Sequence, residues 1–283
     1  MNEYRSALDT TEEYLRNLKG RGVQHLSVRV ETLASLSQQV SFPPAERETQ
    51  AVEPKPVSLP IIPQAIAVAT PPATNGDKDT AMGEIRQRAE ACVKCPHLVG
   101  SRRNVVFGVG DIHSPLMFVG EAPGADEDLQ GEPFVGAAGQ LLTRIIKTMG
   151  LGRDTVYIAN ILKCRPDMPA QSSGNRKPTP DEMRTCLPYL LAQIEVIRPK
   201  VIVALGATAM EGLLGKGEGI TKLRGKFLQF REIPLMPTFH PAYLLRNQAL
   251  TEKRKVWEDM LLVMERLEMP ISEKQRGYFL KAA

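Results

Sequence analysis

Residues 116–136 read LMFVGEAPGADEDLQGEPFVG, a short apolar segment followed by a loop rich in glycine and acidic residues. The five residues at 116–120 have the length and apolar character of a buried strand. The glycines that follow let the backbone approach a ligand closely. Because ligands of an α/β sheet bind beyond the carboxyl ends of its strands, this stretch predicts a central strand and one wall of a binding site.

The pattern around this strand repeats along the chain. Apolar segments of strand length occur again at 156–160, 201–205 and 235–239. Four helices are expected: near 138–150, after the capping sequence that starts at Thr179, directly after Gly206 and over about 252–267. Strands that alternate with helices predict an α/β protein with three αβα layers and a central, mostly parallel, four-stranded sheet. Residues 227–232 are expected to add a β-ribbon.

The first 80 residues differ from the rest in composition and predict an extended N-terminal region. Residues 1–40 are expected to form a helical extension, with one helix at 5–20 that offers a surface for a protein partner. Residues 41–80 contain eight of the 22 prolines. Since proline fixes φ and removes backbone donors, this segment is expected to be a flexible linker. The folded domain is therefore expected over residues 81–283.

The charge is unevenly spread along the chain. Residues 1–80 carry 8 basic and 10 acidic side chains, and the remainder carries 28 basic and 22 acidic ones. A mildly basic domain is compatible with a polyanionic partner, although an ordinary solvated surface explains the balance equally well. No apolar run is long enough for a membrane span, and the charged N-terminus lacks a signal-peptide core. The expectation is a cytoplasmic monomer without a membrane segment.

The cysteines form two pairs, Cys92 with Cys95 and Cys164 with Cys186. The first pair has the spacing of a metal knuckle, and a site of four thiolates is favoured over four unrelated buried thiols. Disulfides are unusual in the cytosol, and a redox pair would need a thioredoxin-like context that is missing here. Zinc and iron–sulfur clusters both accept four thiolates, so spacing alone does not choose between them. His97 lies close to the first pair and is expected to be a surface neighbour of the site.

Several polar and aromatic residues follow the predicted strands. Glu121 and Glu127 place carboxylates at the mouth of the sheet, and Phe134 offers a flat apolar face. The amide of Asn160 can both donate and accept, so it can read one edge of a nucleobase. His240 follows the last predicted strand on the same edge. Taken singly, each of these residues also has an ordinary structural explanation: an acidic turn, a turn-forming asparagine or a structural histidine.

The residues after His240 suggest a contact with nucleic acid. Leu244 and Leu245 followed by Arg246 have the character of an apolar wedge with a phosphate anchor, and such a wedge could enter a base stack. The alternative is that these leucines cap the core.

Three motifs in chain order carry a resemblance to a known family. They are GEAPGADEDLQGEPFVGAAGQLL at 120–142, IANILKCRP at 158–166 with NRKPTPDE at 175–182, and HPAYLLRN at 240–247. Together with the four cysteines they resemble a family 4 uracil-DNA glycosylase, over residues 83–268. The resemblance implies a DNA-repair enzyme that hydrolyses the N-glycosidic bond of deoxyuridine in single- or double-stranded DNA and leaves an abasic site. It also implies a [4Fe-4S] cluster on Cys92, Cys95, Cys164 and Cys186, in a structural and DNA-positioning role.

The resemblance also implies roles for individual residues. Phe134 would stack under the extruded uracil, Asn160 would read its O4 and N3 edge, and His240 would donate a hydrogen bond to O2 as negative charge develops there. Gly120 and Ala122 are expected at the substrate with the backbone N–H groups of their loop. Glu127 is expected to orient that loop.

The residue that activates water is less directly indicated. The best-known members of the superfamily have an aspartate where this chain has Ala122. Glu121 is the first candidate for the water-activating role, and Asn175 is the second. Residues 165–174 form a longer segment than is usual in the family. A related branch that bonds covalently to DNA has an inserted basic segment ending in histidine there, and the absence of histidine in this segment favours hydrolysis.

Three hypotheses remain open at this point. The first is the hydrolytic glycosylase. The second is a protein of the same superfamily that binds uracil-containing DNA without cleaving it, or traps it covalently. The third is a zinc-ribbon adaptor for nucleic acid.

Overall fold

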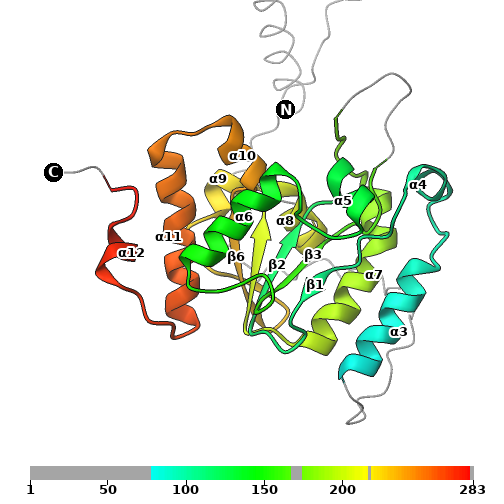
Figure 1. Ribbon diagram of the computed structural model, residues 1–283, viewed down its shortest axis with the longest axis horizontal. Helices are drawn as coiled ribbons and strands as arrows, with labels where there is room; N and C mark the ends of the chain where they lie inside the picture. Colours follow the sequence, from blue (N-terminus) through cyan, green and yellow to red (C-terminus); the bar gives the residue numbers. More distant parts are fainter. Residues whose placement is uncertain (1–77, 167–173, 216–217, 281–283) are drawn as a thin grey trace, which may run out of the picture. The chain divides into compact units, whose positions relative to one another are not determined.

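The computed structural model describes residues 78–166, 174–215 and 218–280 (Figure 1). The helical extension expected over residues 1–40 lies outside the described residues. So does the linker expected over 41–80, apart from its last three residues, which begin helix α3. In the described ranges, no helix is both long and apolar enough to cross a membrane.

A mixed sheet of six strands forms the centre of the described region, in the order β1-β3-β2-β4-β6-β5. Its strands are β1 (Val109–Gly110), β2 (Leu116–Gly120), β3 (Tyr157–Asn160), β4 (Val201–Leu205), β5 (Leu228–Phe230) and β6 (Ile233–Thr238). The four central strands are parallel, which confirms the predicted α/β class and parallel core. Two short antiparallel edge strands raise the number of strands from the four predicted to six, and one of them, β5, lies within the β-ribbon expected at 227–232.

The helices follow the predicted alternation with the strands. They are α3 (Lys78–Glu90), α4 (Pro96–Ser101), α5 (Ala125–Gln130), α6 (Ala137–Thr148), α7 (Pro180–Ile197), α8 (Ala207–Leu214), α9 (Ile220–Leu223), α10 (Pro241–Arg246), α11 (Leu250–Arg266) and α12 (Glu273–Gly277). Helix α7 begins with the capping box that the sequence predicts. The Thr179 hydroxyl accepts from the Glu182 N–H, and the Glu182 carboxylate accepts from the Thr179 N–H.

Alternate residues of β2 show how the three layers arise. Met117 and Val119 face a core that α3, α7 and α8 cover, whereas Leu116 and Phe118 face a second core under α6 and α11. Figure 1 shows these two sets of helices on opposite sides of the sheet. Because successive side chains of a strand point to opposite faces, an unbroken apolar strand requires cover on both faces.

The register of the parallel strands brings their carboxyl ends together. Gly120 at the end of β2 pairs with Asn160 at the end of β3, and Leu205 at the end of β4 pairs with Thr238 near the end of β6. The loops that follow these strands therefore leave from one edge of the sheet, where the candidate residues lie.

Candidate active site

Gly120 lies where an amide and an aromatic ring meet. A Cβ atom added to this glycine would stand 2.4 Å from Asn160 Oδ1 and 2.4 Å from Phe134 Cζ. Such distances are far below van der Waals contact, so no side chain fits there. The hydrogen of Gly120 thus leaves room for the Asn160 amide and the Phe134 ring to converge on the same point.

His240 joins this group from the end of β6. The rings of His240 and Phe134 have centroids 5.7 Å apart and planes tilted by 32°. The Phe134 ring thus lies beside both Asn160, at the end of β3, and His240, which follows β6. The structure therefore places three of the predicted site residues close together at the carboxyl edge of the sheet.

The protonation state of His240 follows from its position as the N-cap of α10. Its Nδ1 accepts the backbone N–H of Ala242 at 3.1 Å. An accepting Nδ1 carries no proton, so the neutral ring carries its proton on Nε2. Burial, assisted by the charge of Arg246, lowers the pKa of His240 to about 4. At neutral pH the residue is a neutral imidazole with one N–H donor to offer.

The side-chain oxygen of Asn160 is a buried acceptor without a donor. Asn160 is 2% exposed, and its Oδ1 has no hydrogen-bond partner among the residues that the structure describes. A buried acceptor left in this state costs about 1–3 kcal/mol. A ligand that brings an N–H group to this oxygen would recover that cost.

Glu127 ties together the two ends of the loop between β2 and α6. One carboxylate oxygen accepts the N–H of Gly124 at 3.0 Å, and the other accepts those of Val135 and Gly136, each at 3.0 Å. The loop that carries Phe134 is therefore closed by a single side chain.

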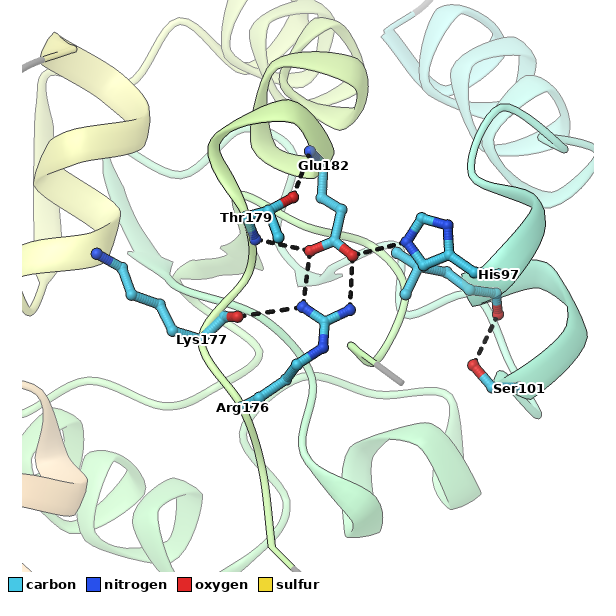
Figure 2. A network of polar contacts seen from close by, with 7 residues as sticks. His97, Ser101, Arg176, Lys177, Thr179 and Glu182 are labelled. Atoms are coloured by element: carbon cyan, nitrogen blue, oxygen red, sulfur yellow. Dashed lines mark hydrogen bonds and ion pairs between the residues drawn. The ribbon is translucent and has the colours of Figure 1, made fainter. Parts of the chain in front are cut away.

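Asn175 belongs to the segment before α7, and its side chain lies near Gly124 and the Glu127 carboxylate. A Cβ atom on Gly124 would stand 2.7 Å from Glu127 Oε2 and 3.0 Å from Asn175 Nδ2. The next residue, Arg176, anchors the segment through two hydrogen bonds to Glu182, of 2.9 and 2.6 Å (Figure 2). The Asn175 amide is thus held near the loop by an ion pair at the start of α7.

Glu121 and Ala122, the first two residues of the loop after β2, have different surroundings. The backbone carbonyl of Glu121 accepts the Leu162 N–H at 3.1 Å, and the residue is partly exposed. The Ala122 side chain packs toward Leu162 and the buried cysteines. The Ala122 side of the loop therefore faces the cysteines.

Three of the four cysteines pack in one apolar cluster next to the loop, and Arg102 links Cys92 to it. Cys164 and Cys186 are buried there with Leu98 and Leu162, and Cys95 packs against them. Donors approach the sulfurs of both buried cysteines: the Arg102 guanidinium is 3.0 Å from Cys164 Sγ, and the Lys163 N–H is 3.2 Å from Cys186 Sγ. Arg102 also donates to the backbone carbonyl of Cys92 at 2.9 Å.

The four cysteines are the candidate ligands for a metal group. In the described part of the chain, no three His, Cys, Asp or Glu side chains are arranged to hold one ion. Zinc and iron–sulfur clusters both accept four thiolates, so these contacts are compatible with either.

His97 pairs with Glu182 instead of pointing at the cysteines. Its Nε2 lies 2.8 Å from Glu182 Oε1, and Figure 2 shows this contact beside the Arg176 pair. The hydrogen bonds from Arg176 hold the pKa of Glu182 at about 2, against the opposing effect of burial. This network borders an open hollow of about 500 Å³. His97 is therefore part of an ion-pair network that joins α4 to the start of α7.

Comparison with known proteins agrees with this geometry. Residues 107–261 match the family model of the uracil DNA glycosylase superfamily. A type-4 uracil-DNA glycosylase from Thermotoga maritima is 46% identical over 186 residues, which cover 65% of this chain and 93% of that protein. The chain belongs to the type-4 uracil-DNA glycosylases. A second member, from Sulfurisphaera tokodaii, is 42% identical over 209 residues, which cover 71% of this chain and 90% of that protein.

A type-5 relative is less similar to this type-4 chain. The type-5 uracil-DNA glycosylase from Pyrobaculum aerophilum is 29% identical over 189 residues, which cover 55% of this chain and 80% of that protein.

The structure corrects one of the predicted DNA contacts of this type-4 glycosylase. Leu244 is 4% exposed and packs with Phe239 and Val256, so its assignment to a wedge is wrong. Helix α10 explains the error, because its periodicity turns Pro241 and Leu244 inward while Leu245 and Arg246 remain at least partly exposed. Leu245 and Arg246 keep the exposure that a DNA contact requires.

The two leucines should respond differently to truncation. Leu244→Ala is expected to lower the free energy of unfolding by about 2–5 kcal/mol, because it leaves a cavity in the core. Leu245→Ala is expected to change it by less than about 1 kcal/mol and to weaken DNA binding. Denaturant unfolding and a DNA-binding titration on both variants measure this contrast. Equal destabilisation would contradict the assignment of Leu245 to the surface.

Two residues beside the site escaped the sequence analysis. Lys163 is fully buried, and its ammonium donates to the Asn160 carbonyl at 3.1 Å and to Gln193 Oε1 at 2.6 Å. Burial lowers the pKa of Lys163 to about 7. Arg153 donates to the backbone carbonyls of Pro133 and Phe134. Lys163 lies in the motif that follows β3, but nothing local shows that its ammonium reaches back to the Asn160 carbonyl, and Arg153 lies in a turn outside the motifs.

Proposed function

We propose that this protein removes uracil from DNA by hydrolysing the bond between the base and the deoxyribose, as the first step of base excision repair. The observation that carries the proposal is the unpaired Asn160 oxygen next to Phe134, whose ring also lies beside His240. The relatives in Thermotoga maritima and Sulfurisphaera tokodaii are named type-4 uracil-DNA glycosylases.

Recognition of the base follows from the amide and the ring. A base inside a duplex cannot enter a slot of this kind, so it must first be extruded. The Phe134 ring then stacks on the face of the uracil, and Asn160 Oδ1 accepts its N3–H while the amide N–H donates to O4. Cytosine presents the opposite donor and acceptor pattern on this edge, so it would leave the buried groups unpaired.

Cleavage of the bond leaves negative charge on uracil O2. The neutral His240 ring can donate its Nε2–H to this oxygen, since Nδ1 is already engaged as an acceptor. A fixed donor aimed at developing charge lowers the barrier without any proton transfer. The N–H groups of the loop that contains Gly120 and Ala122 are proposed to assist at the same edge of the base.

Water must then attack C1′ of a cationic sugar. Glu121 is proposed as the first candidate to orient this water, because it follows directly after Gly120 at the slot. Asn175 is the second, supported by its position beside Gly124 and Glu127. A cationic transition state needs little base strength, so alanine at position 122 is compatible with hydrolysis.

A [4Fe-4S] cluster is proposed on Cys92, Cys95, Cys164 and Cys186. The convergence of these thiols and the donors at their sulfurs support the assignment. When bound, the cluster would join the segment before α4 to the loop after β3 and to α7. Leu245 is proposed to enter the base stack as an apolar wedge, and Arg246 is proposed to contact a phosphate.

An excision assay tests the proposal directly. Purified protein is incubated with an oligonucleotide that contains one uracil, and heating in alkali then breaks the strand at any abasic site. Strand breakage is expected with uracil and not with thymine at the same position, and analysis of the protein is expected to give about four irons per chain. Intact DNA at excess protein would overturn hydrolysis in favour of binding alone, and a protein–DNA adduct on a denaturing gel would indicate covalent trapping.

A further inference from the structure

Phe134 has a backbone conformation that aromatic residues seldom adopt. Its φ is 57°, in the left-handed region, and its side chain is 6% exposed. A bulky residue stays in this region only where its surroundings fix it. The ring lies at the slot, so whatever holds this backbone also sets the plane of the ring.

Arg153 holds the backbone on one side of the strained residue. It comes from the turn before β3, 19 residues along the chain from Phe134. One guanidinium nitrogen donates to the Phe134 carbonyl at 3.0 Å and the other to the Pro133 carbonyl at 2.8 Å. A planar guanidinium can bond two neighbouring carbonyls at once, which an ammonium group does less well.

Glu127 holds the backbone on the other side. It accepts the N–H groups of Val135 and Gly136 that follow Phe134. The carbonyls before and at the strained residue are therefore bound by a cation, and the N–H groups after it by an anion. These two side chains fix the peptide groups that determine the conformation of Phe134.

Helix α6 and the end of β2 pack closely against Phe134. A Cβ atom on Gly139 of α6 would stand 1.9 Å from both the carbonyl carbon and the carbonyl oxygen of Phe134. The ring itself fills the space over Gly120. The strained residue is thus packed between a helix and a strand end, and Arg153 contributes the hydrogen bonds that keep it there.

We propose that Arg153 is a positioning residue, which keeps Phe134 in its left-handed conformation so that the ring presents its face to an extruded base. This inference rests on the proposed function, because the orientation of the ring matters only if a base enters the slot. Without the guanidinium, residue 134 is expected to relax toward negative φ and to turn the ring away from the base.

The test compares Arg153→Gln and Arg153→Lys with wild type and with Arg266→Gln. Arg266 is an exposed arginine at the end of α11, so the last variant controls for the loss of one positive charge. The measurement is affinity for DNA that contains 2′-fluoroarabino-uridine, whose sugar resists cleavage, and for the same DNA with thymine. Arg153→Gln is expected to weaken uracil binding by about tenfold, the size of one base-stacking contact, and to leave thymine-DNA binding unchanged.

A double-mutant cycle shows whether Arg153 acts through the ring. In a Phe134→Ala background, Arg153→Gln is expected to have no further effect on uracil affinity. Arg153→Lys is expected to lie between wild type and Arg153→Gln, and it serves as the test variant if the latter does not fold.

Three results would overturn the inference: unchanged uracil affinity in Arg153→Gln, an equal loss for thymine DNA, or a full effect in the Phe134→Ala background. The second would identify a phosphate contact and the third an action elsewhere. If the wild type itself does not prefer uracil, the proposed function fails first, and that outcome is visible before any variant is compared.

Discussion

Asn160→Ala is expected to lower kcat/KM for uracil excision by about 100-fold while leaving the protein at least as stable as wild type. The loss follows from two hydrogen bonds to the base that alanine cannot make. The stability follows from Oδ1, which is buried without a partner, so its removal takes away a cost that the folded state carries. Single-turnover excision and denaturant unfolding of the same preparation measure the two quantities.

Asn104→Ala is the matched control for this substitution. The Asn104 amide donates to the carbonyls of Asp128 and Leu129, at 2.8 and 3.1 Å, and so has an ordinary structural role. Its removal is expected to cost about 1 kcal/mol of stability with a much smaller effect on excision. The opposite ranking, with Asn160→Ala destabilised and active, would mean that the Asn160 amide is structural.

His240→Asn is expected to reduce the excision rate by about 10²–10³-fold, the usual cost of removing one donor from developing negative charge. Asparagine can still cap α10, whereas His240→Ala also loses the bond from the Ala242 N–H. The alanine variant is therefore expected to be similarly inactive and about 1 kcal/mol less stable than the asparagine variant. Near-normal excision by both variants would show that the ring does not stabilise charge on the base.

Wild type and His240→Asn also allow a test of the pH dependence. The neutral ring is the active form and its pKa is about 4, so excision by wild type is expected to show no titration of His240 near its ordinary value of 6.5. Above that value the folded and unfolded chains both carry a neutral ring. Between 6.5 and about 4 only the unfolded chain takes up the proton, so this residue lowers stability as the pH falls. Unfolding at several pH values should show a shallower dependence in His240→Asn, and a wild-type rate that falls near pH 6.5 would contradict the lowered pKa.

The fold was predictable because each strand of the parallel core is short, apolar and followed by a loop. The same order placed Asn160 and His240 at one edge of the sheet, since parallel strands end together. Of the two edge strands, β5 lies within the β-ribbon expected at 227–232, whereas β1 escaped prediction because it has only two residues, one of them glycine. Pairing with a neighbour, not local apolarity, makes this segment a strand.

The parts of the site that escaped prediction depend on contacts between residues distant in sequence and on which face of a helix a residue occupies. Arg153 reaches Phe134 across 19 residues of chain, and a turn arginine carries no local sign of that contact. Leu244 was misassigned because adjacency in sequence does not say which face of α10 a residue occupies. The unpaired state of the Asn160 oxygen likewise appears only when every neighbouring donor has been located.

The absence of a side chain at Gly120 limits how such a protein can evolve. No residue is smaller than glycine, so the space between the amide and the ring cannot be widened by substitution at this position. Any other side chain would collide with both neighbours at 2.4 Å. A lineage that shifts its preference toward a bulkier lesion must therefore replace Phe134 or Asn160, because no substitution of Gly120 enlarges the space between them.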